Sequence, residues 1–285
     1  MRASACLTVT RSSRDDRCRI TRLRSDPPLV LRSTNPDGPE PPRSWELPGR
    51  MPVRVALAAG AAGPVGGDDL RLAIDVEGGA ALVLRSVAAT LALPGPHGLP
   101  SRSEVVVWVA EDGILSWLPG PLIAARGCDH HESITVALDP GARFLLREEL
   151  ILGRHSENPG SIRRRLRVCL AGRPLLDQEL AIGPGAPGWN GPAVTGGRKA
   201  LGALLLIDPS CENESFKSRL PAPTGDTAVM PLQGPAVLVT ALAIDSLALR
   251  RQLDAALAAV ESALAPVGNQ DACLMRTSAI ASDSG

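Results

Sequence analysis

The chain has 285 residues, and its 30 basic and 30 acidic side chains give a formal net charge of zero. It contains no tyrosine, two phenylalanines and four tryptophans, so it lacks both the positive field and the aromatic platforms that nucleic-acid binding uses. We therefore expect no nucleic-acid partner. The length is sufficient for one substantial core, which leucine, valine, isoleucine and alanine must fill.

The N-terminal segment predicts strands and no targeting signal. Two short alternating runs lie around residues 7–9 and 20–23, and an apolar run follows at 27–31. The first 32 residues contain arginine throughout and have no apolar core of signal-peptide length. No stretch approaches the roughly eighteen apolar residues of a spanning helix. We expect a cytoplasmic protein without a membrane partner, in which the scattered cysteines form neither disulfides nor a zinc ribbon.

A single pattern of strands and glycine turns recurs between about residues 53 and 208, after a loop at 34–52. The turns lie 34, 28 and 31 residues apart, at Gly78-Gly79, Asp112-Gly113, Pro140-Gly141 and Ala171-Gly172. This recurrence is typical of stacked repeats, and glycine between two alternating runs is typical of β-hairpins. The sequence therefore predicts a mainly β scaffold of stacked antiparallel or mixed strands.

The runs between these turns alternate apolar and polar residues. In residues 70–76, 134–138 and 166–170 the alternation predicts strands with one buried and one wet face. Residues 105–109 are almost continuously apolar, which predicts a strand covered on both faces. The three consecutive arginines at 163–165 are interpreted as a solvated strand face.

The C-terminal part changes in period. Glycine and proline make residues 183–197 irregular, and the polar stretch 210–227 is expected to be a mobile loop. Leucine and valine then recur at helical spacing, which predicts a helix over 246–264 capped by Asp245 or Ser246. Its apolar stripe either packs on the β body or meets a partner through Leu253 and Leu257. We expect one domain over 1–266, with a disordered tail at 267–285.

Two sets of side chains are candidate metal ligands. The densest is the run 128–132, in which Cys128, His130 and His131 suit nickel, copper or zinc. An ordinary polar turn is the alternative. The second set is the carboxylates Asp68, Glu148, Asp177 and Glu179 near repeat ends, which stacking can align into a loose path for a divalent ion. Their alternative is a row of exposed strand-end charges.

No nucleophile elbow, phosphate loop, dinucleotide fingerprint or zinc-protease motif is present. Instead, four segments in this order and spacing resemble the urease accessory protein UreD family, also called UreH, in its actinobacterial form. The similarity extends from about residue 5 to 264. The segments that carry it are Gly66-Gly67-Asp68, residues 86–95 ending in Leu93-Pro94-Gly95, Trp117-Leu118-Pro119-Gly120-Pro121, and Arg147-Glu148 through Leu152-Gly153-Arg154.

This resemblance implies a maturation factor and not an enzyme. Members of the family bind the urease apoprotein and, with the accessory proteins UreF and UreG, help to deliver nickel to the urease active site. The resemblance also implies a β-helix-like body with an internal tunnel for nickel in transit, and no tightly bound cofactor. Asp68 and Glu148 are the residues expected nearest that path, with Asp177 a further candidate. The chain departs from the family motif after Arg154.

Two other functions remain open from the residues alone. A β-solenoid enzyme that acts on carbohydrate would align carboxylates for acid and base chemistry, and it requires an aromatic platform for the sugar. A stand-alone metal-binding protein would use Cys128, His130 and His131, and it predicts tight stoichiometric binding of nickel.

Overall fold

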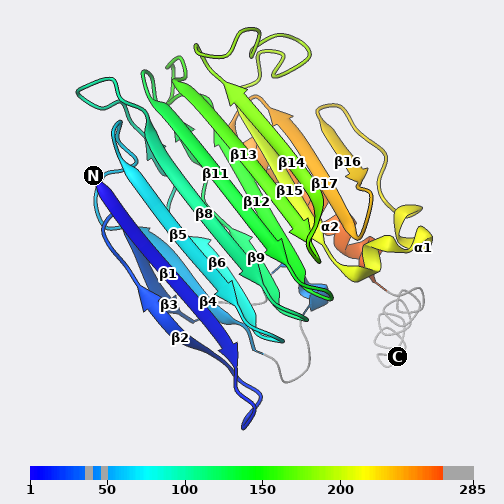
Figure 1. Cartoon of the computed structure of the whole chain (residues 1–285). Coiled ribbons are helices and arrows are strands. Elements are labelled where there is room, and N and C mark those ends of the chain that lie inside the picture. Colours follow the sequence, from blue (N-terminus) through cyan, green and yellow to red (C-terminus); the bar gives the residue numbers. More distant parts are fainter. Residues whose placement is uncertain (36–40, 46–50, 266–285) are drawn as a thin grey trace, which may run out of the picture.

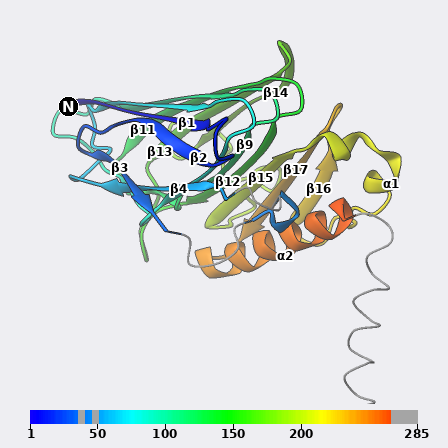
Figure 2. The same ribbon diagram turned by 90° about the horizontal axis from the view of Figure 1, so that it is seen from below.

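The computed structural model describes residues 1–35, 41–45 and 51–265. Two large β-sheets lie face to face, and a long helix covers the outer face of one of them (Figures 1 and 2). The chain is therefore mainly β with stacked coils and a C-terminal helix, as the sequence predicted. The expected tail at 267–285 lies outside the described residues.

Seven strands form the first sheet, which we call sheet A. Its order is β14-β13-β11-β8-β5-β1-β2, and the five strands from β13 to β1 are mutually parallel. The two predicted N-terminal strands are confirmed as β1 and β2, and the apolar run that follows them leads into β3 of the second sheet. The strands of sheet A are β1 (Arg2–Arg11), β2 (Cys18–Arg24), β5 (Asp69–Val76), β8 (Ser101–Val109), β11 (Asp129–Leu138), β13 (Ser161–Leu170) and β14 (Arg173–Ile182).

Ten described strands form the second sheet, sheet B. Its main path is β16-β17-β15-β12-β9-β6-β4-β3, and β7 and β10 pair beside it. These strands are β3 (Leu29–Thr34), β4 (Val53–Ala59), β6 (Ala81–Ser86), β7 (Thr90–Ala92), β9 (Ile114–Leu118), β10 (Leu122–Ala124), β12 (Arg143–Ile151), β15 (Ala200–Ile207), β16 (Thr227–Pro231) and β17 (Ala236–Ala243).

Most of the glycine turns connect the two sheets. The turn at 78–79 leads from β5 to β6, the turn at 112–113 from β8 to β9, and the turn at 140–141 from β11 to β12. The prediction of hairpins is wrong for these three, because each turn passes the chain to the opposite sheet and the repeats then stack in parallel. The turn at 171–172 is a true hairpin between β13 and β14. Alternation within a strand is the same in both arrangements, so local sequence did not distinguish them.

Successive coils approach closely at two glycines of the family-like motifs. Val65 forms a parallel bridge with Leu93, and the Gly66 amide donates to the Leu93 carbonyl at 3.0 Å. A Cβ on Gly95 would lie 2.1 Å from the Gly66 oxygen. Glycine is required there because no side chain fits between the two backbones.

The helix α2 (Ser246–Leu264) has the bounds that the sequence predicted. Asp245 caps it by accepting a hydrogen bond from the Ala248 amide at 2.7 Å. The helix packs against β15 and β17, on the face of sheet B that points away from sheet A (Figure 2). Its leucine stripe is therefore buried within the chain, where Leu253 is fully buried and Leu257 is 8% exposed.

The segment 210–227 differs from the expected loop. It contains the short helix α1 (Glu214–Lys217), preceded by a 3-10 turn, η2 (Pro209–Glu212). Cys211 and Phe216 are buried against the α2 side of sheet B, which anchors a stretch that is polar in composition. The predicted irregular segment 183–197 contains no helix or strand, and neither do residues 198 and 199. Of the loop 34–52, the described part includes a second 3-10 turn, η1 (Arg43–Trp45).

One strand was assigned the wrong surroundings. The nearly continuous apolar run at 105–109 belongs to β8, but only its odd-numbered valines point inward. Trp108 is 40% exposed on the outer face of sheet A, which the described elements leave uncovered. The expectation of cover on both faces is therefore wrong, because this sheet packs on one side alone.

Candidate functional site: a polar layer between two cavities

The interior between the sheets contains a polar layer that separates two apolar clusters. On β13, Ile162 belongs to one cluster and Leu166 to the other, and Arg164 is the inward residue between them. On β12, Glu148 lies in the same way between Leu146 and Leu150. The two strands thus place an arginine and a glutamate at the same depth on facing sheets.

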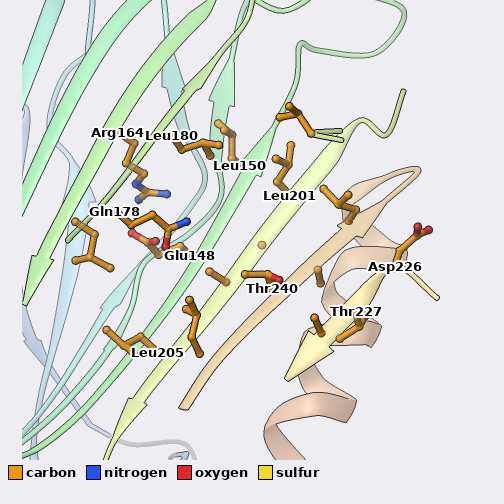
Figure 3. A pocket seen from close by; sticks show the side chains of 18 of the residues that line it. Glu148, Leu150, Arg164, Gln178, Leu180, Leu201, Leu205, Asp226, Thr227 and Thr240 are labelled. Atoms are coloured by element: carbon orange, nitrogen blue, oxygen red, sulfur yellow. Dashed lines mark ion pairs between the residues drawn. The ribbon is translucent and has the colours of Figure 1, made fainter. Parts of the chain in front are cut away.

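Arg164 is held by carboxylates from both sheets. Glu132 is its register neighbour on β11, and the Arg164 Nε lies 2.5 Å from Glu132 Oε2. From sheet B, Glu148 Oε1 lies 3.1 Å from Arg164 Nη2. The side chains of Arg164, Glu132 and Glu148 are 12%, 15% and 11% exposed. Figure 3 shows Arg164 and Glu148 pointing toward one another.

Burial governs the electrostatics of this layer. Desolvation raises the pKa of Glu148; the Arg164 charge opposes that shift and Glu132 adds to it. Burial works against the charge on Arg164, but Glu132 and Glu148 outweigh it and raise the pKa of the guanidinium. Buried ion pairs of this kind cost several kcal/mol of desolvation per ion and stabilise a fold weakly. A perturbed carboxyl that adjoins a cavity is therefore a candidate functional group.

A cavity adjoins each side of the layer. One, of about 590 Å³, opens between β12, β15 and β17 of sheet B and β13 and β14 of sheet A, and is lined mainly by leucine and alanine with Glu148, Arg164 and Gln178 (Figure 3). The other, of about 160 Å³, is lined by His130, Glu132, Arg164 and Trp117 among others. Among the described residues around these two cavities, Arg164 is the only one that lines both.

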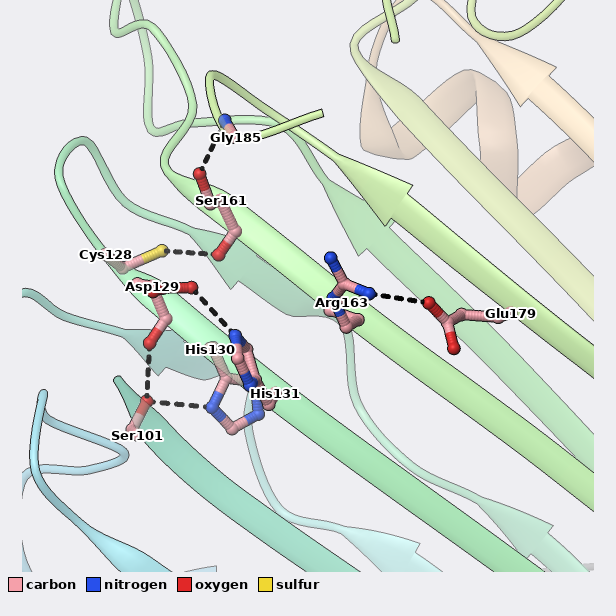
Figure 4. Close-up of polar contacts among 9 residues, drawn as sticks. All are labelled: Ser101, Cys128, Asp129, His130, His131, Ser161, Arg163, Glu179 and Gly185. Atoms are coloured by element: carbon pink, nitrogen blue, oxygen red, sulfur yellow. Dashed lines mark hydrogen bonds and ion pairs between the residues drawn. The ribbon is translucent and has the colours of Figure 1, made fainter. Parts of the chain in front are cut away.

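His130 and His131 do not converge, because consecutive residues of β11 alternate in direction. His130 points inward, where its Nδ1 lies 2.9 Å from Ser101 Oγ and burial lowers its pKa. His131 lies on the outer face, 3.2 Å from Asp129 (Figure 4).

The third member of the set, Cys128, has its own surroundings. Its thiol is 3.9 Å from the Ser161 carbonyl, and burial raises its pKa to about 11. Across the described residues, no group of three or more His, Cys, Asp and Glu side chains lies close enough to hold a metal ion. The arrangement does not support the three-ligand site considered from the sequence.

The predicted carboxylates lie in three different surroundings. Glu148 faces the interior. Asp68 is buried immediately before β5, where its carboxylate accepts hydrogen bonds from the Met1 ammonium at 2.9 Å and from the Val65 amide at 2.8 Å. Asp177 lies on the outer face of β14, and Arg165, which hydrogen-bonds it at 2.8 Å, lowers its pKa.

Asp177 therefore points away from the interior, and its assignment to a nickel path stays a prediction. The inward residue beside it on β14 is Gln178, which lines the larger cavity. Glu179 also points outward, to Arg163 (Figure 4).

Sequence reasoning placed neither Arg164 nor Glu132 in the interior, although Glu132 belongs to the ligand run 128–132. Arg163 and Arg165 point outward as interpreted, but Arg164 shares the phase of Leu166 and Val168, which the same alternation marks as inward. Glu132 likewise shares the phase of Ile134. The signal that could have identified Arg164 and Glu132 was a charged residue at a position where the alternation of the strand predicts a buried apolar side chain.

Comparison with known proteins identifies the family. The family model described as UreD urease accessory protein matches residues 3–279. The chain belongs to the UreD family. It is 45% identical over 240 residues to the urease accessory protein UreD of Streptomyces avermitilis, covering 84% of this chain and 89% of that protein. It is also 45% identical over 260 residues to urease accessory protein UreD 3 of Streptomyces griseus, covering 90% and 96%.

These UreD relatives are named as accessory proteins, and this chain is accordingly a maturation factor rather than an enzyme. At its departure from the family motif, the turn after Gly153 is closed locally. The Arg154 amide and guanidinium donate to Glu157 at 2.8 to 3.0 Å. In the part of the chain that the structure describes, no helix is long and apolar enough to cross a membrane.

Proposed function

We propose that this UreD-family chain is a scaffold that binds apo-urease together with UreF and UreG and passes nickel through its interior to the urease active site. Membership of the UreD family supports the role in urease maturation. The observation that supports an internal route is the polar layer of Glu132, Arg164 and Glu148, which adjoins a cavity on each side. The cytoplasmic location is part of the same proposal.

The chemistry of this layer suits transient contact with a cation. Carboxylate oxygens are ligands for divalent ions, and a single carboxylate without a surrounding cage holds such an ion weakly. His130 adds an imidazole to the wall of the smaller cavity. Burial lowers the pKa of His130 and so favours the neutral imidazole, which is the form that binds metals. Asp68 is a further acidic group immediately before β5, although the Met1 ammonium pairs with it.

Complementation in a urease-positive host tests this function. Deletion of the gene is expected to lower both the nickel content and the activity of urease, and the intact gene restores them. Glu148→Gln is expected to restore them poorly, whereas Glu179→Gln, which alters an exposed outer carboxylate, serves as the matched control and restores them fully. Unchanged urease nickel after deletion would overturn the role in maturation.

Copurification separates the scaffold from the nickel route. Tagged wild-type and Glu148→Gln proteins are expected to recover the same amounts of urease subunits, UreF and UreG, because Glu148 lies inside the body and not on its surface. Loss of these partners with Glu148→Gln, at an equal level of folded protein, would place its effect in assembly and not in transit.

A further inference from the structure

The two cavities meet at a single side chain. The larger cavity reaches Glu148 and the smaller reaches Glu132, and the guanidinium of Arg164 lies between these carboxylates and lines both spaces. An ion that moved through the interior directly from one cavity to the other would therefore meet this guanidinium.

Arg164 already occupies the place that a cation would take. Its positive charge satisfies one carboxylate from each sheet, at 2.5 Å and 3.1 Å. With all three groups ionised the cluster has a net charge of minus one, so it still attracts cations. An incoming ion must nevertheless compete with the guanidinium for the same oxygens.

Attraction to the carboxylates favours a divalent ion over a monovalent one in that competition. A monovalent ion carries the same charge as the guanidinium, so it gains nothing by replacing it. A divalent ion carries twice the charge and is attracted about twice as strongly at the same distance. The larger cavity lies directly beside Arg164 and, at about 590 Å³, has room to receive the displaced side chain.

We propose that Arg164 is a displaceable plug that closes the passage between the two cavities to monovalent ions and yields to a divalent ion. This inference rests on the proposed function and assigns to it a residue that determines which ions pass. Because the guanidinium keeps competing for the oxygens of Glu132 and Glu148, it weakens their hold on the ion, so the ion is bound transiently and not stored.

Titration of the full-length protein with nickel chloride tests the plug. Arg164→Gln removes the competing charge, and the variant is expected to bind nickel at least tenfold more tightly than the wild type. The double variant Arg164→Gln/Glu148→Gln is expected to lose that gain. Arg163→Gln is the matched control, because Arg163 is the adjacent arginine with an outward side chain paired to Glu179, and it is expected to bind as the wild type does.

Thermal unfolding gives a second measurement. Nickel is expected to raise the melting temperature of Arg164→Gln by several degrees more than that of the wild type. If Arg164→Gln does not fold, Arg164→Lys replaces it in both assays. Its ammonium cannot span both carboxylates as the guanidinium does, so this variant is expected to bind nickel more tightly than the wild type.

Equal nickel affinity in the wild type and the folded variant overturns the plug. That result leaves the maturation role intact if deletion of the gene still lowers urease nickel. Unchanged urease nickel after deletion overturns the proposed function whatever the titration gives.

Discussion

Leu253→Ala is a direct test of what holds α2 on the sheet. Leu253 is fully buried, and a Cβ on Gly202 of β15 would lie 2.7 Å from its Cδ1, so the helix contacts the sheet closely at this point. The substitution removes three buried carbon atoms, which corresponds to about 2.4 kcal/mol of transfer free energy. The strands beneath are fixed by their ladders and cannot collapse into the space, so the cavity raises the expected loss of unfolding free energy to roughly 3 to 4 kcal/mol.

Urea denaturation followed by far-ultraviolet circular dichroism measures this loss. Leu247→Ala on the same helix is the control, because Leu247 is 57% exposed and its truncation is expected to change the unfolding free energy by less than about 0.5 kcal/mol. Equal effects of the two substitutions would refute the packing argument. Copurification of the folded variants also tests the unresolved hypothesis that Leu253 and Leu257 meet a partner. Loss of partner at unchanged stability would favour that hypothesis.

Three further outcomes follow from burial and close approach. Burial raises the pKa of Glu148 in the folded protein. Ionisation of this carboxyl therefore lowers the stability of the folded state once the pH rises above about 4.3, the ordinary pKa of a glutamate in an unfolded chain. The melting temperature of Glu148→Gln relative to the wild type is therefore expected to increase from pH 4 to pH 8, and a constant difference would contradict this. Cys128, with a pKa of about 11, is expected to resist iodoacetamide at pH 8 in the folded protein, as mass spectrometry of labelled peptides will show, and rapid labelling would contradict its burial. Gly95→Ala is expected to lower the unfolding free energy by about 3 kcal/mol, because its methyl group would meet the Gly66 oxygen at 2.1 Å. Gly78→Ala, whose nearest neighbour is at 3.6 Å, is the control in the same denaturation assay, and equal losses would contradict the clash.

The elements that local pattern specifies were predicted well. The helix Ser246–Leu264 is set by the spacing of its leucines and by Asp245, both of which are properties of consecutive residues. The strands are set by alternation in the same way. The family resemblance, carried by glycines at Gly66 and Gly95, was also present in the sequence before their contact was known.

Which strands pair with which does not follow from the local sequence. A glycine turn between two alternating runs is compatible with a hairpin and with a passage between sheets. The parallel stacking of β5, β8 and β11 decides between them through hydrogen bonds formed across more than 25 residues of chain. The outward direction of Asp177 belongs to the β13–β14 hairpin, in which its partners Arg165 and Arg167 lie on the neighbouring strand.

By itself the sequence determined the family, the mainly β composition and the C-terminal helix, because each depends on residue types at short or fixed spacing. Only the tertiary structure decided that Arg164 meets Glu132 across a ladder and Glu148 across the space between two sheets. The physical reason is that a buried charge is stabilised by partners in space. Arg164 and its two partners lie on three strands, β13, β11 and β12, that the chain brings together only when its coils stack.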